Sequence, residues 1–523
     1  MKKIIFIVLC VVLLVVAVGC TPIFVGGIGG GTSGGTSGGS DFSDETTAKN
    51  NDFYKNYSKE EKDLYYLLWK DTTKISIKID IEPKELVKIN EGYNDAVKAE
   101  IYRKCNLTIT VNGKDYVFDE VGIRMHGNTS RRDFCNGEGN IYAFVHFRFN
   151  LTETFDGEGY GEGEWGNDIA KTWTDEARLQ RKNRSFATLE KFYYKWNKNY
   201  DNSYVREVYA NKMFQAYGVL APHITLAQLS LKQRGTFENL GVGMLYETVD
   251  KHFIKRNFSS AEAKGDLYKC GYQTAPANLT TADGRGVEAP GQKFNYALKT
   301  NTDRTSPEYG HHKHLMALID ILKTSKTAED FRAKLESVVD MGYFTNFEAV
   351  NYLLGNPDCI RNNSNNYYLY FLPNGKVFFI PYDYDRCLGI NVDWNPSGNG
   401  MTTITPYSVN GAAGKTSNPL YTKTILSSGT DYYRNMYQSK LQKVLNGEWF
   451  TYAHFQTVFQ NYKNNYAKVV LLSQNIQNQC GGNVKMNRLE FSERGTSDLG
   501  SRDDNLTTQN YIELKRKCAL DNL

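Results

Sequence analysis

The chain is poor in proline, in histidine and in net charge. Its 523 residues include 12 Pro and 8 His, and 62 Lys+Arg against 58 Asp+Glu give a formal charge of +4. A balance this close to neutrality argues against the strongly basic surface of a nucleic-acid or anionic-membrane binder. The sequence also lacks CxxC pairs and Cys/His ligand spacing, which argues against a zinc site.

The composition that remains is that of a globular protein. Hydrophobic residues make up 41%, aromatic residues 13% and charged residues 23% of the chain. This mixture excludes a largely disordered chain, and the length allows more than one lobe or domain. The 36 Tyr and 27 Phe indicate many aromatic-rich strands.

The N-terminus resembles a bacterial lipoprotein signal. Lys2 and Lys3 precede an uncharged apolar run, Ile4–Gly19, which is shorter than the roughly 20 residues of a membrane span. Small residues end the run immediately before Cys20, so we expect Cys20 to be acylated and the mature protein to be extracytoplasmic, on the cell surface or periplasmic side. The alternatives are an ordinary signal peptide or an uncleaved anchor.

The expected organisation has four parts. Residues 1–19 form a lipoprotein-type signal peptide, and residues 20–50 form a Gly/Ser/Thr-rich tether, because such a stretch cannot bury a core. The main domain spans residues 74–475, and residues 476–523 form a C-terminal extension. Seven cysteines remain outside the leader and anchor, so at least one is expected to be free.

Hydrophobic periodicity places the main elements. Alternation predicts a strand from Lys74 and a hairpin around Asn112-Gly113, which suits a type I′ turn. The other predicted strands are 142–151, 223–231 and 242–249, and the predicted helices are 204–217, 308–324, 328–340 and 344–353. Residues 428–475 also read as helical, and a second hairpin covers 367–380.

The most informative segment is residues 355–389. Asp358 lies in a loop before the second hairpin, Asn366 begins its first strand, and Asp383 and Asp385 follow its second strand. The hairpin would bring these side chains to one end. Phosphoryl transfer needs a carboxylate beside the accepting hydroxyl, and an Asn and an Asp to hold Mg²⁺. Taken alone, such an Asn/Asp-rich segment is more often a set of turn residues.

Several blocks in the same order resemble the CotH kinase family of atypical secreted protein kinases. The blocks are GIRMHGNTS (122–130), DNSYVREVYA (201–210), GVLAP (218–222), GMLYETVD (243–250), DLYK (266–269) and the 355–389 segment. Their order and spacing match the family from about residue 75 to residue 445. The resemblance covers most of the mature chain.

The resemblance implies an α+β, protein-kinase-like bilobal fold with a β-rich N-lobe and a mainly helical C-lobe. It also implies phosphorylation of Ser or Thr with ATP and Mg²⁺ or Mn²⁺ as cofactors. By motif, Asp358 is the catalytic residue, and Asn366, Asp383 and Asp385 hold the metal. Asn362, Asn363 or Asn365 could replace Asn366 in that role.

The resemblance also implies phosphate-contacting groups in the N-terminal part. The candidates are Arg124, Gly127, Asn128, Ser130, Lys191 and Lys269. Glu247 could pair with a phosphate-binding Lys or could have no role. The strand after the 127–130 loop departs from the family pattern, because it carries Arg148 where Lys-rich sequence is common.

Two features near the site leave alternatives open. Cys359 and Cys387 could form a disulfide or remain buried thiols. The cluster from His311 to His314 is more typical of a helix opening than of a metal site.

The sequence and the family resemblance are compatible with two functions. The first is a tethered kinase acting on secreted or envelope proteins, with nucleotide as a partner, no nucleic acid, and membrane contact through the lipid alone. The second is a non-catalytic surface adhesin or scaffold with the same fold.

Overall fold

The structure is a computed structural model of the chain. It describes residues 52–523 except 128–129, 157–172, 200, 274, 282, 289–291, 304, 308, 326, 391–399, 410–417, 428–430, 481–490 and 492–505. The predicted leader, tether and Cys20, and also Asn128, lie outside the described residues. Within the described ranges, no helix has both the length and the apolar character that a bilayer crossing requires.

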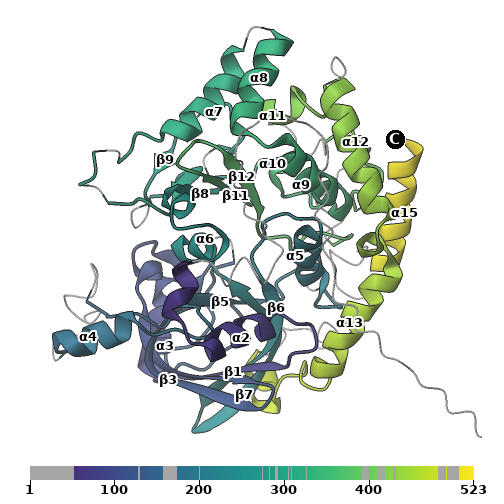
Figure 1. The fold of residues 1–523 in the computed structure, drawn as a ribbon. Helices are drawn as coiled ribbons and strands as arrows, with labels where there is room; N and C mark the ends of the chain where they lie inside the picture. Colours follow the sequence, from purple (N-terminus) through teal and green to yellow (C-terminus); the bar gives the residue numbers. More distant parts are fainter. Residues whose placement is uncertain are drawn as a thin grey trace, which may run out of the picture.

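Seven strands of the first half of the chain close into a barrel, at the bottom of Figure 1. They are β1 (Ile75–Asp80), β2 (Arg103–Val111), β3 (Lys114–His126), β4 (His146–Asn150), β5 (Lys191–Trp196), β6 (Ile224–Gln233) and β7 (Thr236–Glu247). Their order is β1-β2-β3-β4-β5-β7-β6, and parallel pairing of β1 with β6 closes the ring. The sequence analysis predicted strands here but not their closure.

The barrel encloses its own hydrophobic core. Alternate residues of the strands, such as Ile77, Ile109 and Phe149, are fully buried in it. Helices α2 (Lys59–Leu68) and α3 (Pro83–Glu91) add Leu64 and Leu86 to the same core. Residues before the predicted domain start at residue 74 therefore pack against the barrel.

Two tight turns set the register of the barrel hairpins. Asn112 and Gly113 both have positive φ, at 47° and 89°, which confirms the predicted Asn-Gly turn between β2 and β3. Arg234 and Gly235 do the same between β6 and β7, with φ of 50° and 83°. Both strands extend to this turn. β6 therefore continues past residue 231, and β7 begins before residue 242, where the sequence predicted the two strands to end and to begin.

A smaller sheet and a group of helices form the rest of the fold. The sheet has the order β12-β11-β8-β10-β9, from β8 (Asp266–Cys270), β9 (Arg285–Gly286), β10 (Tyr296–Leu298), β11 (Tyr367–Phe371) and β12 (Val377–Pro381). The second hydrophobic core joins this sheet, the helices and one side of the barrel.

Most helices outside the barrel lie in the upper part and along the right-hand side of Figure 1. They are α5 (Arg206–Ala216), α6 (Lys251–Asn257), α7 (Lys313–Thr324), α8 (Ala328–Val338), α9 (Met341–Leu354), α10 (Ile360–Asn363), α11 (Pro419–Thr422), α12 (Asp431–Asn446), α13 (Tyr452–Tyr466), α14 (Gln474–Cys480) and α15 (Thr508–Asp521). A further helix, α4 (Asp175–Lys182), projects from the barrel side. Fold class α+β is confirmed.

Several element boundaries differ from those predicted. The helix expected from residue 308 begins at Lys313, because Gly310 and His312 have φ of 80° and 48°, which a helix cannot continue through. Residues 428–475 are broken near Gly447 into α12 and α13. The strand expected from residue 142 starts at His146, because Cys135 and Ile141 form a separate bridge before it.

The C-terminal helix α15 was not predicted. Its Tyr511 and Ile512 are buried in the second core, and the Tyr511 hydroxyl donates to the carbonyl of Leu353 at 2.9 Å. The buried Lys515 donates from Nζ to the carbonyls of Met401 and Ile404, each at 3.0 Å. The helix therefore holds residues 401–404 in place.

Candidate functional site

A buried ion pair joins the barrel to helix α5. Lys195 lies near the end of β5, and Glu207 lies in the first turn of α5. The Lys195 Nζ is 2.9 Å and 2.8 Å from Glu207 Oε1 and Oε2, and both side chains are buried. The Tyr246 hydroxyl, from β7, also donates to Glu207. Barrel and helix are thus linked through one carboxylate.

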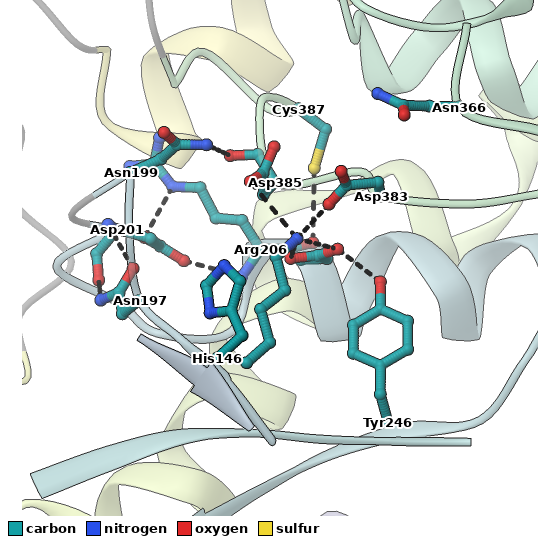
Figure 2. A network of polar contacts seen from close by, with 12 residues as sticks. His146, Asn197, Asn199, Asp201, Arg206, Tyr246, Asn366, Asp383, Asp385 and Cys387 are labelled. Carbon is teal, nitrogen blue, oxygen red and sulfur yellow. Dashed lines mark hydrogen bonds and ion pairs between the residues drawn. The ribbon is translucent and has the colours of Figure 1, made fainter. Parts of the chain in front are cut away.

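The same ammonium reaches the loop after β12. Lys195 Nζ donates to Asp383 and lies 3.3 Å from Asp385 Oδ2. Asp383 adopts a left-handed backbone, with φ of 58°, which turns the chain directly after β12. Asn199 donates to the carbonyl of Asp385 at 3.3 Å and helps to hold this loop (Figure 2).

Burial and charge compete at this cluster. Burial alone would lower the pKa of Lys195, but the carboxylates of Asp383, Asp385 and Glu207 outweigh it and raise that pKa well above its usual value. Burial opposes the ionised form of Asp383, yet Lys195 outweighs burial and lowers the pKa of Asp383. Burial raises the pKa of Asp385, and it raises that of Glu207 to about 7.

One ammonium therefore faces three carboxyl groups. Carboxylate oxygens of Glu207, Asp383 and Asp385 all lie within 4.8 Å of one another. Mg²⁺ and Mn²⁺ prefer hard oxygen ligands, and a divalent cation would offset the excess of negative charge. The donor set fits such an ion, and it includes Asp383 and Asp385, which the sequence analysis named as metal ligands.

Asp358 is surrounded by amide donors. The side-chain amides of Asn363 and Asn365 donate to its Oδ1 at 2.6 Å and 2.9 Å, and that of Asn366 donates to its Oδ2 at 3.1 Å. Burial raises the pKa of Asp358, although these amides partly stabilise the ionised form. Its carboxylate is therefore held in one orientation.

Asn366 is placed differently from the expectation for a metal ligand. Its amide faces Asp358, also donating to that residue's carbonyl at 3.0 Å, and Figure 2 shows it apart from the network around Asp383. Its own carbonyl accepts from the Tyr382 amide at 3.2 Å. The hairpin thus brings Asn366 beside the residue preceding Asp383. Asp383 in turn contributes to the raised pKa of Asp358.

The predicted phosphate-contacting residues lie in two places. Lys269, on β8, is 4.6 Å from the ring centre of Tyr382 and helps to lower the pKa of Asp383. Arg124 is paired with Glu100 at 2.7 Å, and Arg124 and Lys191 both act on the pKa of Tyr102. Lys269 is therefore beside the acidic cluster, and the other two cations are grouped around Tyr102.

The loop that begins at Gly127 is tightly folded. Gly127 has φ of 104°, and a Cβ atom there would lie 1.9 Å from the Oγ of Ser130. Glycine is therefore required at this turn. Ser130 is buried, and Asn128 lies outside the described residues.

The structure decides two alternatives that the sequence left open, for Glu247 and for the cysteines near the site. Glu247 pairs with Arg256 at 2.8 Å and accepts from Tyr65 at 2.8 Å, so its ionic partner is this Arg and not a phosphate-binding Lys. Cys359 and Cys387 are free, buried thiols in the structure.

The histidine cluster opens a helix, as predicted. His312 immediately precedes α7, is buried, and lies 2.8 Å from the Tyr268 hydroxyl through its Nδ1. It does not belong to the group of acidic side chains suited to a metal among the described residues.

Lys195 and Glu207 are the residues that the sequence analysis missed. The available signal was a lysine near the end of an aromatic strand, followed by a helix that opens with Arg-Glu. In protein kinases, a strand lysine and a helix glutamate form an ion pair beside the metal-binding Asp. The lysine could not be chosen from spacing because other lysines lie in comparable strands.

A cavity opens beside the acidic cluster. It is lined by residues of the β5 end, of the segment between β5 and α5, of α5, of β7 and of the loop after β12, namely Lys195, Trp196, Asn197, Lys198, Asn199, Asp201, Tyr204, Glu207, Met244, Asp385 and Ile390. Asp201 accepts from the backbone of Ser203 and Arg206, at 3.0 Å each, and so shapes the turn into α5.

A buried Lys–Glu pair beside two aspartates, with a further oriented aspartate nearby, is the arrangement of a kinase-like protein. The family comparison agrees: the family model described as CotH kinase protein matches residues 170–489, and the chain belongs to this family. The matched residues include Lys195, Glu207 and Asp358 but not the 122–130 block. A comparison with curated proteins found no match.

Proposed function

We propose that this protein is an ATP-dependent kinase that phosphorylates Ser or Thr hydroxyls of secreted or envelope proteins. The observation that carries the proposal is the Lys195 ammonium, which contacts both Glu207 and Asp383. The barrel and the helical part would then act as the two lobes of a kinase-like fold, with the site between them.

Each side chain has a role in the proposed reaction. Asp358 accepts the proton of the attacking hydroxyl, and its raised pKa makes it a better base than an exposed carboxylate. Asn363, Asn365 and Asn366 orient it. Asp383 and Asp385 would hold Mg²⁺ or Mn²⁺, which supplies positive charge to the transferring phosphoryl group.

Lys195 positions the metal-binding loop. Its contacts with Glu207 and Asp383 set the distance between α5 and the loop after β12. Because phosphoryl transfer depends mainly on positioning and electrostatics, a change at this ammonium should affect the rate strongly.

The test is transfer of labelled phosphate from ATP, with Mg²⁺ or Mn²⁺, to the protein itself and to secreted proteins of the same cell. Asp383→Asn should abolish incorporation, and Asp320→Asn, at an exposed position on α7, should not change it. Absence of transfer by the wild-type protein, with no thermal shift by ATP and metal, would instead favour the scaffold function.

The proposed location is the outer side of a membrane, through a lipid on Cys20. The signal-like residues 1–19 and the Gly-rich stretch after them motivate it. Cys20→Ser should move the protein from the membrane fraction to the soluble fraction. An unchanged membrane fraction would argue for an uncleaved anchor.

A further inference from the structure

Two arginines, the buried Arg124 and the partly buried Arg148, lie directly opposite each other on the face of the barrel sheet that points away from the barrel interior. Arg124 of β3 pairs in register with Arg148 of β4. Like charges in directly opposite positions of adjacent strands repel and destabilise a sheet. Arg124 is balanced by Glu100, at 2.7 Å. Within the described part of the chain, no hydrogen bond or ion pair is recorded for Arg148, and its Nε is buried without a partner.

The surroundings of Arg148 are strongly positive. Burial should raise the pKa of Tyr102, yet Arg148, Arg124 and Lys191 together lower it. Burial lowers the pKa of His126, and Arg148, Lys269 and Arg124 lower it further. The nearby acids are Glu100, paired with Arg124, Glu288, paired with Lys299 at 2.9 Å, and Asp250, which caps α6. This leaves an excess of positive charge.

This positive region is continuous with the catalytic cluster. Arg148 lies opposite Tyr193 on β5, and Lys195 follows two residues later on the same face of that strand. Such diagonal neighbours are roughly 7–8 Å apart. The neighbouring residues Phe147, Phe149 and Tyr194 belong to the barrel core. Arg148, Tyr193 and Lys195 alternate with them and therefore lie on the opposite face of the sheet.

We propose that Arg148 is the centre of a phosphate-binding site that takes the polyphosphate tail of the donor nucleotide. The inference rests on the proposed function and adds to it the position of the phosphates. The ammonium of Lys195 is occupied by three carboxyl groups, so it cannot by itself balance a polyphosphate. The guanidinium of Arg148 can donate charge-assisted hydrogen bonds. Lys269 acts with Arg148 on the pKa of His126 and also helps to lower the pKa of Asp383.

The test compares the full-length wild-type protein with Arg148→Gln by titration calorimetry. The probes are inorganic tripolyphosphate, inorganic phosphate, ATP with Mg²⁺, and adenosine. Tripolyphosphate and ATP should bind the wild type, and Arg148→Gln should weaken both by about tenfold or more. Any adenosine binding should be the same in both proteins. A preference for inorganic phosphate over tripolyphosphate would overturn assignment to the nucleotide tail.

A matched control and a stability measurement separate binding from a structural role. Arg332→Gln removes an exposed guanidinium on α8 and should leave tripolyphosphate binding unchanged. Arg148→Gln removes a repulsion, so its melting temperature without ligand should stay the same or rise. A lower melting temperature, or unchanged tripolyphosphate affinity, would overturn the proposal.

The two proposals can fail separately. If tripolyphosphate binds through Arg148 but no phosphate is transferred, the phosphate-binding site is supported and the kinase activity is contradicted. If Arg148→Gln transfers phosphate with an unchanged KM for ATP, the kinase activity is supported and the phosphate-binding role of Arg148 is contradicted.

Discussion

The ammonium of Lys195 lies 2.9 Å and 2.8 Å from the two carboxylate oxygens of Glu207, with both side chains buried. The pair joins β5 to α5, and the same ammonium contacts Asp383. One side chain thus connects the barrel, a helix of the second core and the loop after β12.

Lys195→Met should reduce phosphate transfer by about 100-fold or more, because the loop carrying Asp383 loses its anchor. It should also lower the free energy of unfolding by roughly 3–5 kcal/mol, because buried carboxyl groups lose their counter-charge. Labelled-ATP transfer and urea unfolding measure the two effects. Lys182→Met, at an exposed lysine of α4, is the control. Full activity of a folded Lys195→Met protein would contradict the assignment.

Asn365→Ala should lower kcat by roughly tenfold to a hundredfold and leave the KM for ATP unchanged. Its amide donates to Asp358 at 2.9 Å, so the change removes one of the three amides that orient that carboxylate and leaves Lys195, Asp383 and Asp385 in place. Steady-state kinetics over a range of ATP concentrations tests this. Asn522→Ala, at an exposed position after α15, should behave as wild type. A change confined to the KM for ATP would contradict an orienting role.

Glu348→Gln should lower the free energy of unfolding by roughly 3–5 kcal/mol, because it leaves the buried Arg361 guanidinium without its ionic partner. Glu348 also accepts from Tyr421 at 2.7 Å and from Asn351 at 2.8 Å. Urea unfolding measures the loss. Glu336→Gln, which breaks a partly exposed pair with Arg332, should cost at most about 1 kcal/mol. If both variants lose the same free energy of unfolding, burial of the ion pair does not determine the size of the loss.

Acidification should destabilise the fold through His146, which is buried, and His223, which is partly buried. Burial lowers the pKa of His146 to about 3 and that of His223 to about 4, against a usual value of 6.5. The unfolded chain therefore binds more protons than the folded one below pH 6.5, and stability falls as the pH falls toward these values. At pH 5 the loss is about 2 kcal/mol for each residue.

Urea unfolding at pH 7.5 and pH 5.0 tests this dependence. His146→Gln should show a smaller loss of stability between the two pH values than wild type. His311→Gln, at an exposed position, should retain the wild-type loss. If His146→Gln loses as much stability as wild type, the neutral buried imidazole is not a source of acid sensitivity.

The sequence analysis named the acidic residues of one segment and did not name Lys195 or Glu207. Asp358, Asn366, Asp383 and Asp385 lie in one short segment, so a hairpin with a tight turn was enough to bring them near one another. Lys195 is distant from them in sequence and reaches Asp383 through the packing of β5 beside that loop. No local pattern separates this lysine from Lys191, four residues earlier.

The same limit applies to the fold. Period-two alternation and the Asn112-Gly113 turn predicted β1, β2 and β3 correctly, because neighbouring residues set both signals. Closure of the barrel depends on pairing between β1 and β6, and the docking of α15 depends on contacts of Tyr511 with α9. Both contacts join residues far apart in the chain.

Local sequence was sufficient for most strands and helices, for the Asn112-Gly113 turn and for the acidic residues of one loop. Backbone conformational preference and side-chain periodicity act over a few residues and can be read directly. The partner of each buried charge could not be read in this way. An ammonium such as that of Lys195 can be buried where packing supplies its carboxylates, and which carboxylates those are depends on how distant elements meet.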